Sequence, residues 1–125
     1  MERKRVYIAG CYSADGVLLV LDNIRIGMRM GTELMLKGFA PFCPWLDHQF
    51  QFMLQGDEKL VVEDYYEYSL AWLEVSQAML VLPGFENSKG TAKEIERAKE
   101  LFIPVFYHVE DLIKWSTNPK NIEDY

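Results

Sequence analysis

Short apolar runs alternate along this chain with longer segments in which apolar residues recur every three or four positions. The runs favour strands, and glycine, proline or polar residues bound each of them. They predict strands at 6–9, 39–43, 79–82 and 103–107. Pro41 and Pro44 confine the second strand to a sheet edge. The periodic segments predict helices at 17–37, 59–77, 91–101 and 109–115.

This alternation predicts the fold class. The strands are too apolar to keep one face in water, which indicates a parallel sheet with helices on both faces. We therefore predict a small doubly wound α/β domain, flavodoxin-like or Rossmann-like, with about four to five parallel strands. With 125 residues the chain is expected to be one domain. Residues 118–125 are expected to form a loose tail.

The periodic segments also predict which helix faces are buried. In the first helix the predicted stripe consists of Val17, Leu21, Ile24, Met28, Gly31 and Met35. Gly27 and Gly31 each weaken that helix by about 1 kcal/mol relative to alanine, so we expect close packing against a strand or another subunit. Gly38 stands where a C-terminal cap is expected. Trp72, in the next helix, is expected in the core.

Composition excludes several classes of protein. The chain has 13 Lys and Arg against 19 Asp and Glu, a net charge of −6, which argues against binding nucleic-acid polymers. Two cysteines are too few for a disulfide framework. No apolar run approaches the about 20 residues that cross a bilayer. We therefore expect a cytoplasmic protein with no membrane partner. No side chains have zinc-ligand spacing, and neither a metal nor a cofactor is expected.

One candidate site is the loop of residues 10–16, after the first predicted strand. It leads into a helix N-terminus, where free backbone amides attract anions. It lacks the glycine spacing of known phosphate loops. Ser13 or Asp15 therefore also fits a simple helix-capping role.

The loop of residues 83–91 precedes a second candidate, Glu94. Thr91 and Glu94 have the spacing of a capping box, in which the glutamate binds an amide of its own helix. Alternatively, the helix dipole keeps Glu94 ionised as a nucleophile. Ser88 and the backbone of Lys89 and Gly90 would then hold an anionic group of the ligand.

Several motifs together resemble a known superfamily. They are Tyr7-Ile8-Ala9-Gly10 with Tyr12-Ser13, Asn23 in the first helix, Pro44 with His48, Leu70-Ala71-Trp72-Leu73, Pro83-Gly84-Phe85, and Ser88-x-Gly90-x-x-x-Glu94. In this order, across residues 6–107, they resemble the nucleoside 2-deoxyribosyltransferase-like superfamily. The outline is most similar to its small phage and bacterial branches and to the 2′-deoxynucleoside 5′-phosphate N-hydrolases.

The resemblance implies cleavage of the N-glycosidic bond of a nucleoside or nucleoside 5′-monophosphate, by hydrolysis or by base transfer. Glu94 would attack the sugar C1′ and form a glycosyl-enzyme, as in retaining glycosidases. Tyr12, Ser13 and Ser88 would hold a phosphate. The expected substrate-binding residues are Gly10, Tyr12, Ser13, Trp45, Ser69, Gly84, Ser88 and Gly90. The resemblance also implies a homodimer or a higher homo-oligomer.

The chain departs from the superfamily pattern at three positions. Ser69 stands where an aspartate usually assists protonation of the leaving base, and Gln77 and Cys11 replace a second aspartate and a proline. Serine cannot serve as a general acid near neutral pH. The rate enhancement that a general acid supplies, about 10²–10⁴-fold, would then be missing unless another residue provides it.

Other side chains are candidates for the missing function. The candidates to replace the missing general acid are Glu67, Asp64 and His48. His48 is the catalytic candidate because histidine works as acid or base near neutral pH, although one local hydrogen bond would explain it equally well. Trp45, Phe50 and Phe52 would either stack on a nucleobase or fill the loop core.

Two other functions remain open. Ser69 and Gln77 favour a nucleotide-binding module or sensor with little or no catalysis. Pro83-Gly84 with Gly90-Thr91 and Glu94 loosely resembles the PGGxGTxxE loop of lysine-decarboxylase-like phosphoribohydrolases. Release of free base from a panel of nucleotides would distinguish the three functions.

Overall fold

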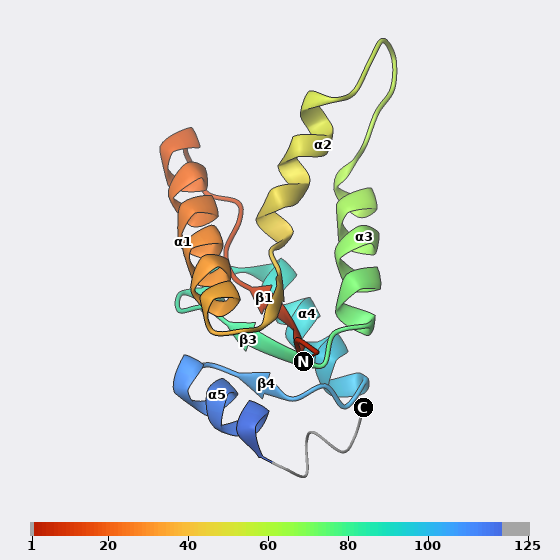
Figure 1. Cartoon of the computed structure of the whole chain (residues 1–125). Helices are drawn as coiled ribbons and strands as arrows, with labels where there is room; N and C mark the ends of the chain where they lie inside the picture. Colours follow the sequence, from red (N-terminus) through yellow and green to blue (C-terminus); the bar gives the residue numbers. More distant parts are fainter. Residues whose placement is uncertain (1, 119–125) are drawn as a thin grey trace.

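The computed structural model describes residues 2–118, which form one four-stranded parallel sheet in the order β2-β1-β3-β4. The strands are β1 (Arg5–Ala9), β2 (Ala40–Phe42), β3 (Ala78–Val81) and β4 (Val105–Phe106). The helices that cover the sheet are α1 (Val17–Leu36), α3 (Val62–Glu74), α4 (Lys89–Glu100) and α5 (Val109–Thr117) (Figure 1). The predicted doubly wound α/β fold is confirmed, and β2 lies at an edge. The predicted loose tail, from residue 119 onward, lies outside the described residues.

Alternate residues of the central strand explain the two helical layers. Val6 and Ile8 pack with Leu34 of α1 and Leu112 of α5 on one face of the sheet. Tyr7 and Ala9 pack with residues of α3 and α4 on the other. Because all four of these strand residues are buried, β1 has no polar alternation from Val6 to Ala9, and only Arg5 at its start is exposed.

The buried face of α1 agrees with the predicted stripe in part, because Gly31 is buried and Ile24 and Met28 pack against the core. The helix buries Gly27, Gly31 and Leu34, while Val17 is 76% and Met35 54% exposed. A Cβ atom on Gly27 would lie 2.4 Å from the indole of Trp45. A Cβ on Gly31 would lie 2.4 Å from the sulfur of Cys43. The glycines therefore set which side of α1 faces the sheet, and their close contacts are made within the chain.

Two further predictions are corrected. Trp72 is 48% exposed and stacks on Phe42 with ring centroids 5.8 Å apart, so it lies outside the buried core. The stretch 45–58, for which the sequence predicts neither a helix nor a strand, begins as a 3₁₀ helix, η1 (Pro44–His48), followed by α2 (Gln49–Phe52). Figure 1 shows this segment projecting away from the sheet before the chain returns to α3.

The helix ends follow local sequence signals. Gly38 follows α1 with a φ of 92°, a left-handed conformation that suits a glycine after a helix. The helix α4 begins two residues earlier than predicted because Ser88 is its N-cap, and the Oγ of Ser88 accepts a hydrogen bond from the Thr91 amide at 3.2 Å.

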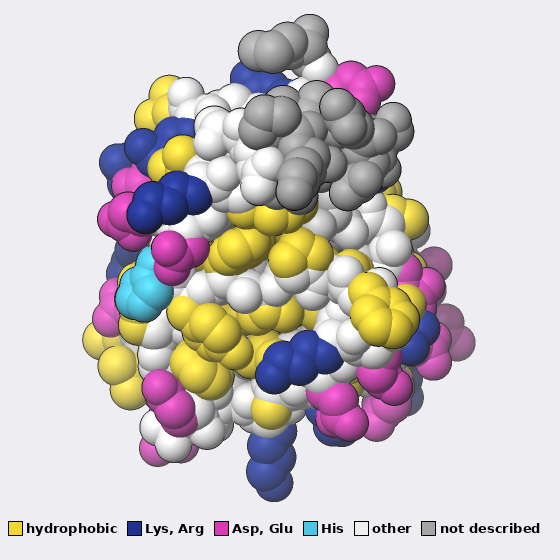
Figure 2. All heavy atoms as spheres, turned by 90° about the horizontal axis from the view of Figure 1, so that it is seen from below, with side chains coloured by type: hydrophobic (Ala, Val, Ile, Leu, Met, Phe, Trp, Pro, Cys, Tyr) yellow, Lys and Arg dark blue, Asp and Glu magenta, His cyan; other side chains and the backbone are white. Residues whose placement is uncertain are grey.

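The surface agrees with the acidic composition. Figure 2 shows the side of the molecule remote from α2, where apolar side chains lie among Lys, Arg, Asp and Glu. No continuous band of Lys and Arg crosses this face in the described part of the chain. None of the helices formed by residues 2–118 is long and apolar enough to span a bilayer.

Candidate active site

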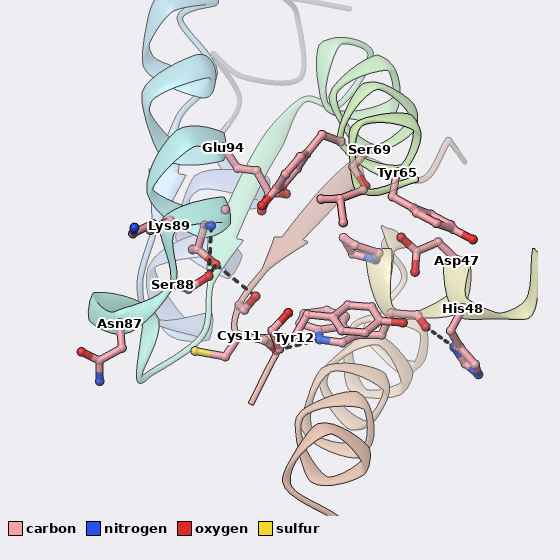
Figure 3. Close-up of a pocket in the computed structure, with 18 of the residues that line it drawn as sticks. Cys11, Tyr12, Asp47, His48, Tyr65, Ser69, Asn87, Ser88, Lys89 and Glu94 are labelled. Atoms are coloured by element: carbon pink, nitrogen blue, oxygen red, sulfur yellow. Dashed lines mark hydrogen bonds between the residues drawn. The ribbon is translucent and has the colours of Figure 1, made fainter. Parts of the chain in front are cut away.

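A cavity of about 520 Å³ opens beyond the carboxyl end of β1. The strand order changes direction between β1 and β3, which is where doubly wound sheets bind ligands. Side chains from the loop after β1, from η1, from α3 and from the first turns of α4 line it (Figure 3). The predicted site residues in the lining are Gly10, Tyr12, Ser13, Trp45, His48, Ser69, Ser88, Gly90 and Glu94.

All of the expected substrate-binding residues are described, and among them Gly84 alone does not line the cavity. It forms a left-handed turn with a φ of 87° after β3 and is the N-cap of η2 (Phe85–Asn87). Its carbonyl oxygen accepts a hydrogen bond from the Cys11 thiol at 2.9 Å. Its place in the fold is therefore that of a turn glycine beside the site.

Glu94 points into the cavity and belongs to a chain of hydrogen bonds. The hydroxyl of Tyr7 donates to Oε2 of Glu94, and the hydroxyl of Ser69 in turn hydrogen-bonds the Tyr7 oxygen. These residues come from β1, α4 and α3, so the sheet and the helices on one of its faces position the carboxylate together. Burial and the charge of Glu94 raise the pKa of Tyr7 well above its usual range, which keeps Tyr7 a donor.

The capping-box interpretation of Glu94 is wrong. Ser88 caps α4, three residues before Thr91, so Glu94 lies in the second turn instead of the first. Thr91 uses its hydroxyl to donate to the carbonyl of Gly10 at 3.0 Å. Glu94 therefore does not tie off its own helix, and its carboxylate is held by the phenol of Tyr7 from the neighbouring strand.

Burial raises the pKa of Glu94 from an ordinary 4.5 to about 7. The hydrogen bond from Tyr7 acts in the opposite direction, and the charge of Asp47 adds to the increase. A carboxylate that is half ionised near neutral pH and faces an open cavity is typical of an active site. This is the strongest electrostatic feature of the cavity.

Asp47 is not among the site residues predicted from the sequence, but it lies on the opposite side of the cavity in η1 (Figure 3). It is 8% exposed, and its burial raises its pKa, opposed by a hydrogen bond with Tyr12 and by nearby His48. The same contact, together with burial, raises the pKa of Tyr12 to about 12. Tyr12 therefore donates its hydroxyl proton to the carboxylate of Asp47.

Three backbone carbonyls of the loop after β1 are bound by three different elements. Gly10 accepts from Thr91 of α4 at 3.0 Å, and Cys11 accepts from the indole of Trp45 at 2.9 Å. Tyr12 accepts from the side-chain amide of Asn23 in α1 at 3.1 Å. The loop is thus fixed in position, because moving it would leave buried polar groups without partners.

The start of α4 is the most suitable place for an anionic group. The first amides of a helix have no acceptor within the helix, and here they belong to Lys89 and Gly90 in the cavity wall. Gly90 lies close to Tyr66, because a Cβ on Gly90 would be 3.3 Å from that ring. The side chain of Lys89 adds a positive charge.

The remaining predicted aromatic and acidic residues have clear positions. Trp45 is 1% exposed, so the structure places this ring in the core, beneath the cavity. Phe50 packs edge-on against Tyr68, and Phe52 packs edge-on against His48. The Nδ1 of His48 contacts the carbonyl of Trp45, the local hydrogen bond that had been an alternative explanation for this histidine.

Glu67 and Asp64 do not reach the cavity. Both are exposed on α3, and the carboxylate of Asp64 accepts a hydrogen bond from the Val61 amide at 2.8 Å, which caps the helix. Among residues 2–118, no three His, Cys, Asp or Glu side chains gather in a way that could hold a metal ion.

Comparison with known proteins places this chain in a family. A family described as a domain of unknown function, DUF7768, matches residues 4–108. The chain belongs to this DUF7768 family. No curated protein is similar enough in sequence to match.

Among solved structures, the DUF7768 chain is similar to a 2-deoxyribosyltransferase from Bacillus psychrosaccharolyticus. The two share 16% sequence identity with a TM-score of 0.56. The similarity covers 81% of this chain and 69% of the other. At this level of identity, the likeness shows that the two proteins share a fold.

Proposed function

We propose that the chain cleaves the N-glycosidic bond of a nucleoside or nucleoside 5′-monophosphate, with Glu94 as nucleophile. The observation that carries this proposal is the position of Glu94: its carboxylate faces a cavity large enough for a nucleotide and is bound by Tyr7 instead of by its own helix. The similar fold of a 2-deoxyribosyltransferase supports the same chemistry.

The reaction has two steps. An oxygen of Glu94 forms a bond to the sugar C1′ while the bond from C1′ to the base nitrogen breaks. Water or a second base then attacks C1′ and releases the carboxylate. Ser88 and the amides of Lys89 and Gly90 hold a phosphate at the start of α4, where the helix dipole favours an anion.

The test is release of free base from a panel of deoxyribonucleosides, ribonucleosides and their 5′-monophosphates. We expect release from at least one substrate and its loss in Glu94→Gln. The control is Glu96→Gln, an exposed residue of the same helix, which should keep wild-type activity. Base release that continues unchanged in Glu94→Gln would contradict the proposal.

A second function is favoured by Ser69, which lies buried in the cavity where the family resemblance expects an acid. A nucleotide sensor would keep the pocket and lose efficient catalysis. In that case a monophosphate would raise the unfolding temperature without release of base, even at high protein concentration and long times. Release confined to ribonucleotides with N6-modified adenine would instead indicate a phosphoribohydrolase.

A further inference from the structure

The cavity contains a second buried carboxyl group, Asp47, which the proposed function leaves unused. It is 8% exposed and lies in η1, across the cavity from Glu94 (Figure 3). None of the salt bridges among the described residues involves it. A buried carboxyl group that forms no salt bridge costs stability, so its presence in a ligand cavity points to a chemical role.

We propose that Asp47 is the general acid and base of this site, in place of the acid that Ser69 cannot supply. The inference rests on the proposed function, because it assigns the proton of the same reaction. Ser69 uses its hydroxyl on Tyr7, and Glu67 and Asp64 lie outside the cavity. The general acid of this site therefore comes from η1, and not from the position of Ser69 in α3.

The geometry favours Asp47 over its neighbour His48. In Figure 3 the carboxylate of Asp47 points toward the interior of the cavity, whereas the ring of His48 lies at the rim and turns away from Glu94. The Nδ1 of His48 is engaged with the carbonyl of Trp45. The hydroxyl of Tyr12 hydrogen-bonds the carboxylate of Asp47 and so helps to hold it in the cavity.

The proton balance of the reaction is simple. As the bond from C1′ to the base breaks, its electron pair goes to the base nitrogen, which takes the proton from Asp47. Glu94 is then bonded to C1′, and Asp47 is a carboxylate. Water attacks C1′ and gives its proton to Asp47, and the electron pair of the bond from Glu94 to C1′ returns to Glu94. Both carboxyl groups end in their starting states.

Both carboxyl groups of the cavity are harder to ionise than an exposed carboxyl group. Burial raises the pKa of both Glu94 and Asp47, and the charge of Asp47 raises the pKa of Glu94 further. One ionised and one protonated carboxyl group is the combination that the reaction requires. The titratable and charged groups that interact with Asp47 or line the same cavity are Tyr7, Cys11, Tyr12, His48, Tyr65, Tyr66, Lys89 and Glu94.

The experiment compares two leaving groups in Asp47→Asn. One substrate is the nucleoside monophosphate that the wild type cleaves best, and the other is the corresponding 7-methylguanine nucleotide, whose cationic base leaves without protonation. We expect kcat to fall about 10²–10⁴-fold with the neutral base and less than about tenfold with the cationic base. Asparagine keeps an oxygen for Tyr12, and exposed Glu67→Gln is the matched control.

A second measurement needs no variant. In the wild type, the decline of kcat/KM at high pH should appear with the neutral base and be absent with the cationic one. Equal losses with both substrates in Asp47→Asn, or the same alkaline decline with both, would overturn the role of Asp47 and leave the proposed function standing. Failure of the wild type to release either base would overturn both.

Discussion

Glu94→Gln should stabilise the fold while it removes activity, and the effect should grow with pH. The pKa of Glu94 is about 7 in the folded chain against an ordinary 4.5. Between these values the folded state binds more protons than the unfolded chain, so the free energy of unfolding falls as pH rises toward 7. Glutamine keeps an acceptor for Tyr7 but cannot ionise, so the variant escapes this loss.

The magnitude follows from the pKa difference. At about 1.4 kcal/mol for each pH unit, ionisation of Glu94 costs up to about 3 kcal/mol above pH 7. The carboxyl group is partly accessible from the cavity, so solvent screening reduces the expected gain of the variant to about 2 kcal/mol between pH 5 and pH 8.

The assay is urea unfolding of wild type and variant at pH 5 and pH 8 and at one ionic strength. Exposed Glu96→Gln on the same helix should stay within about 0.5 kcal/mol of the wild type at both pH values. A difference between Glu94→Gln and the wild type that is the same at pH 5 and pH 8 would refute the reasoning that burial destabilises the ionised carboxylate.

The remaining predictions concern the packing and titration of the same site. Gly27→Ala should lower the free energy of unfolding in urea by about 1–3 kcal/mol, because its Cβ would lie 2.4 Å from Trp45. Gly16→Ala, whose Cβ would have no atom within 4 Å, should lower it less. Equal losses in the two variants would contradict the packing argument. In the wild type, kcat/KM for base release should fall about tenfold per pH unit below about pH 7, because only ionised Glu94 attacks C1′. A flat pH profile down to pH 5 would exclude ionised Glu94 as the nucleophile. Tyr7→Phe removes the hydrogen bond that favours the ionised form, so the acid limb of that profile should move to higher pH; an unchanged limb would show that the phenol does not control Glu94.

Local sequence signals were enough to predict the order of the strands and helices. They also predicted the part of the candidate site that lies at the start of α4. Apolar runs bounded by glycine and proline predict all of the strands among the described residues, and Gly38 predicts the end of α1, because these signals act through the backbone conformation of a few neighbouring residues. The motif around Ser88 and Glu94 is local in the same sense, and the structure places both residues in one cavity.

The other half of the site could not be read from spacing. Tyr7 binds Glu94 across 87 positions of the chain, and Asp47 faces the cavity because η1 follows an edge strand that lies beside β1. The available signal was a phenol in an otherwise aliphatic buried strand, since a buried tyrosine hydroxyl needs a partner. The partner itself lay far away in sequence.

The sequence by itself determined the doubly wound sheet and the position of the acidic residue near the start of α4, because periodicity and helix signals depend on near neighbours. Tertiary structure alone decided that Ser88, not Thr91, caps this helix, that the glycines of α1 face Trp45 and Cys43, and that Glu94 is held by Tyr7 opposite Asp47. These outcomes depend on which surfaces meet when distant segments pack, and burial in that packing is what raises the pKa of Glu94.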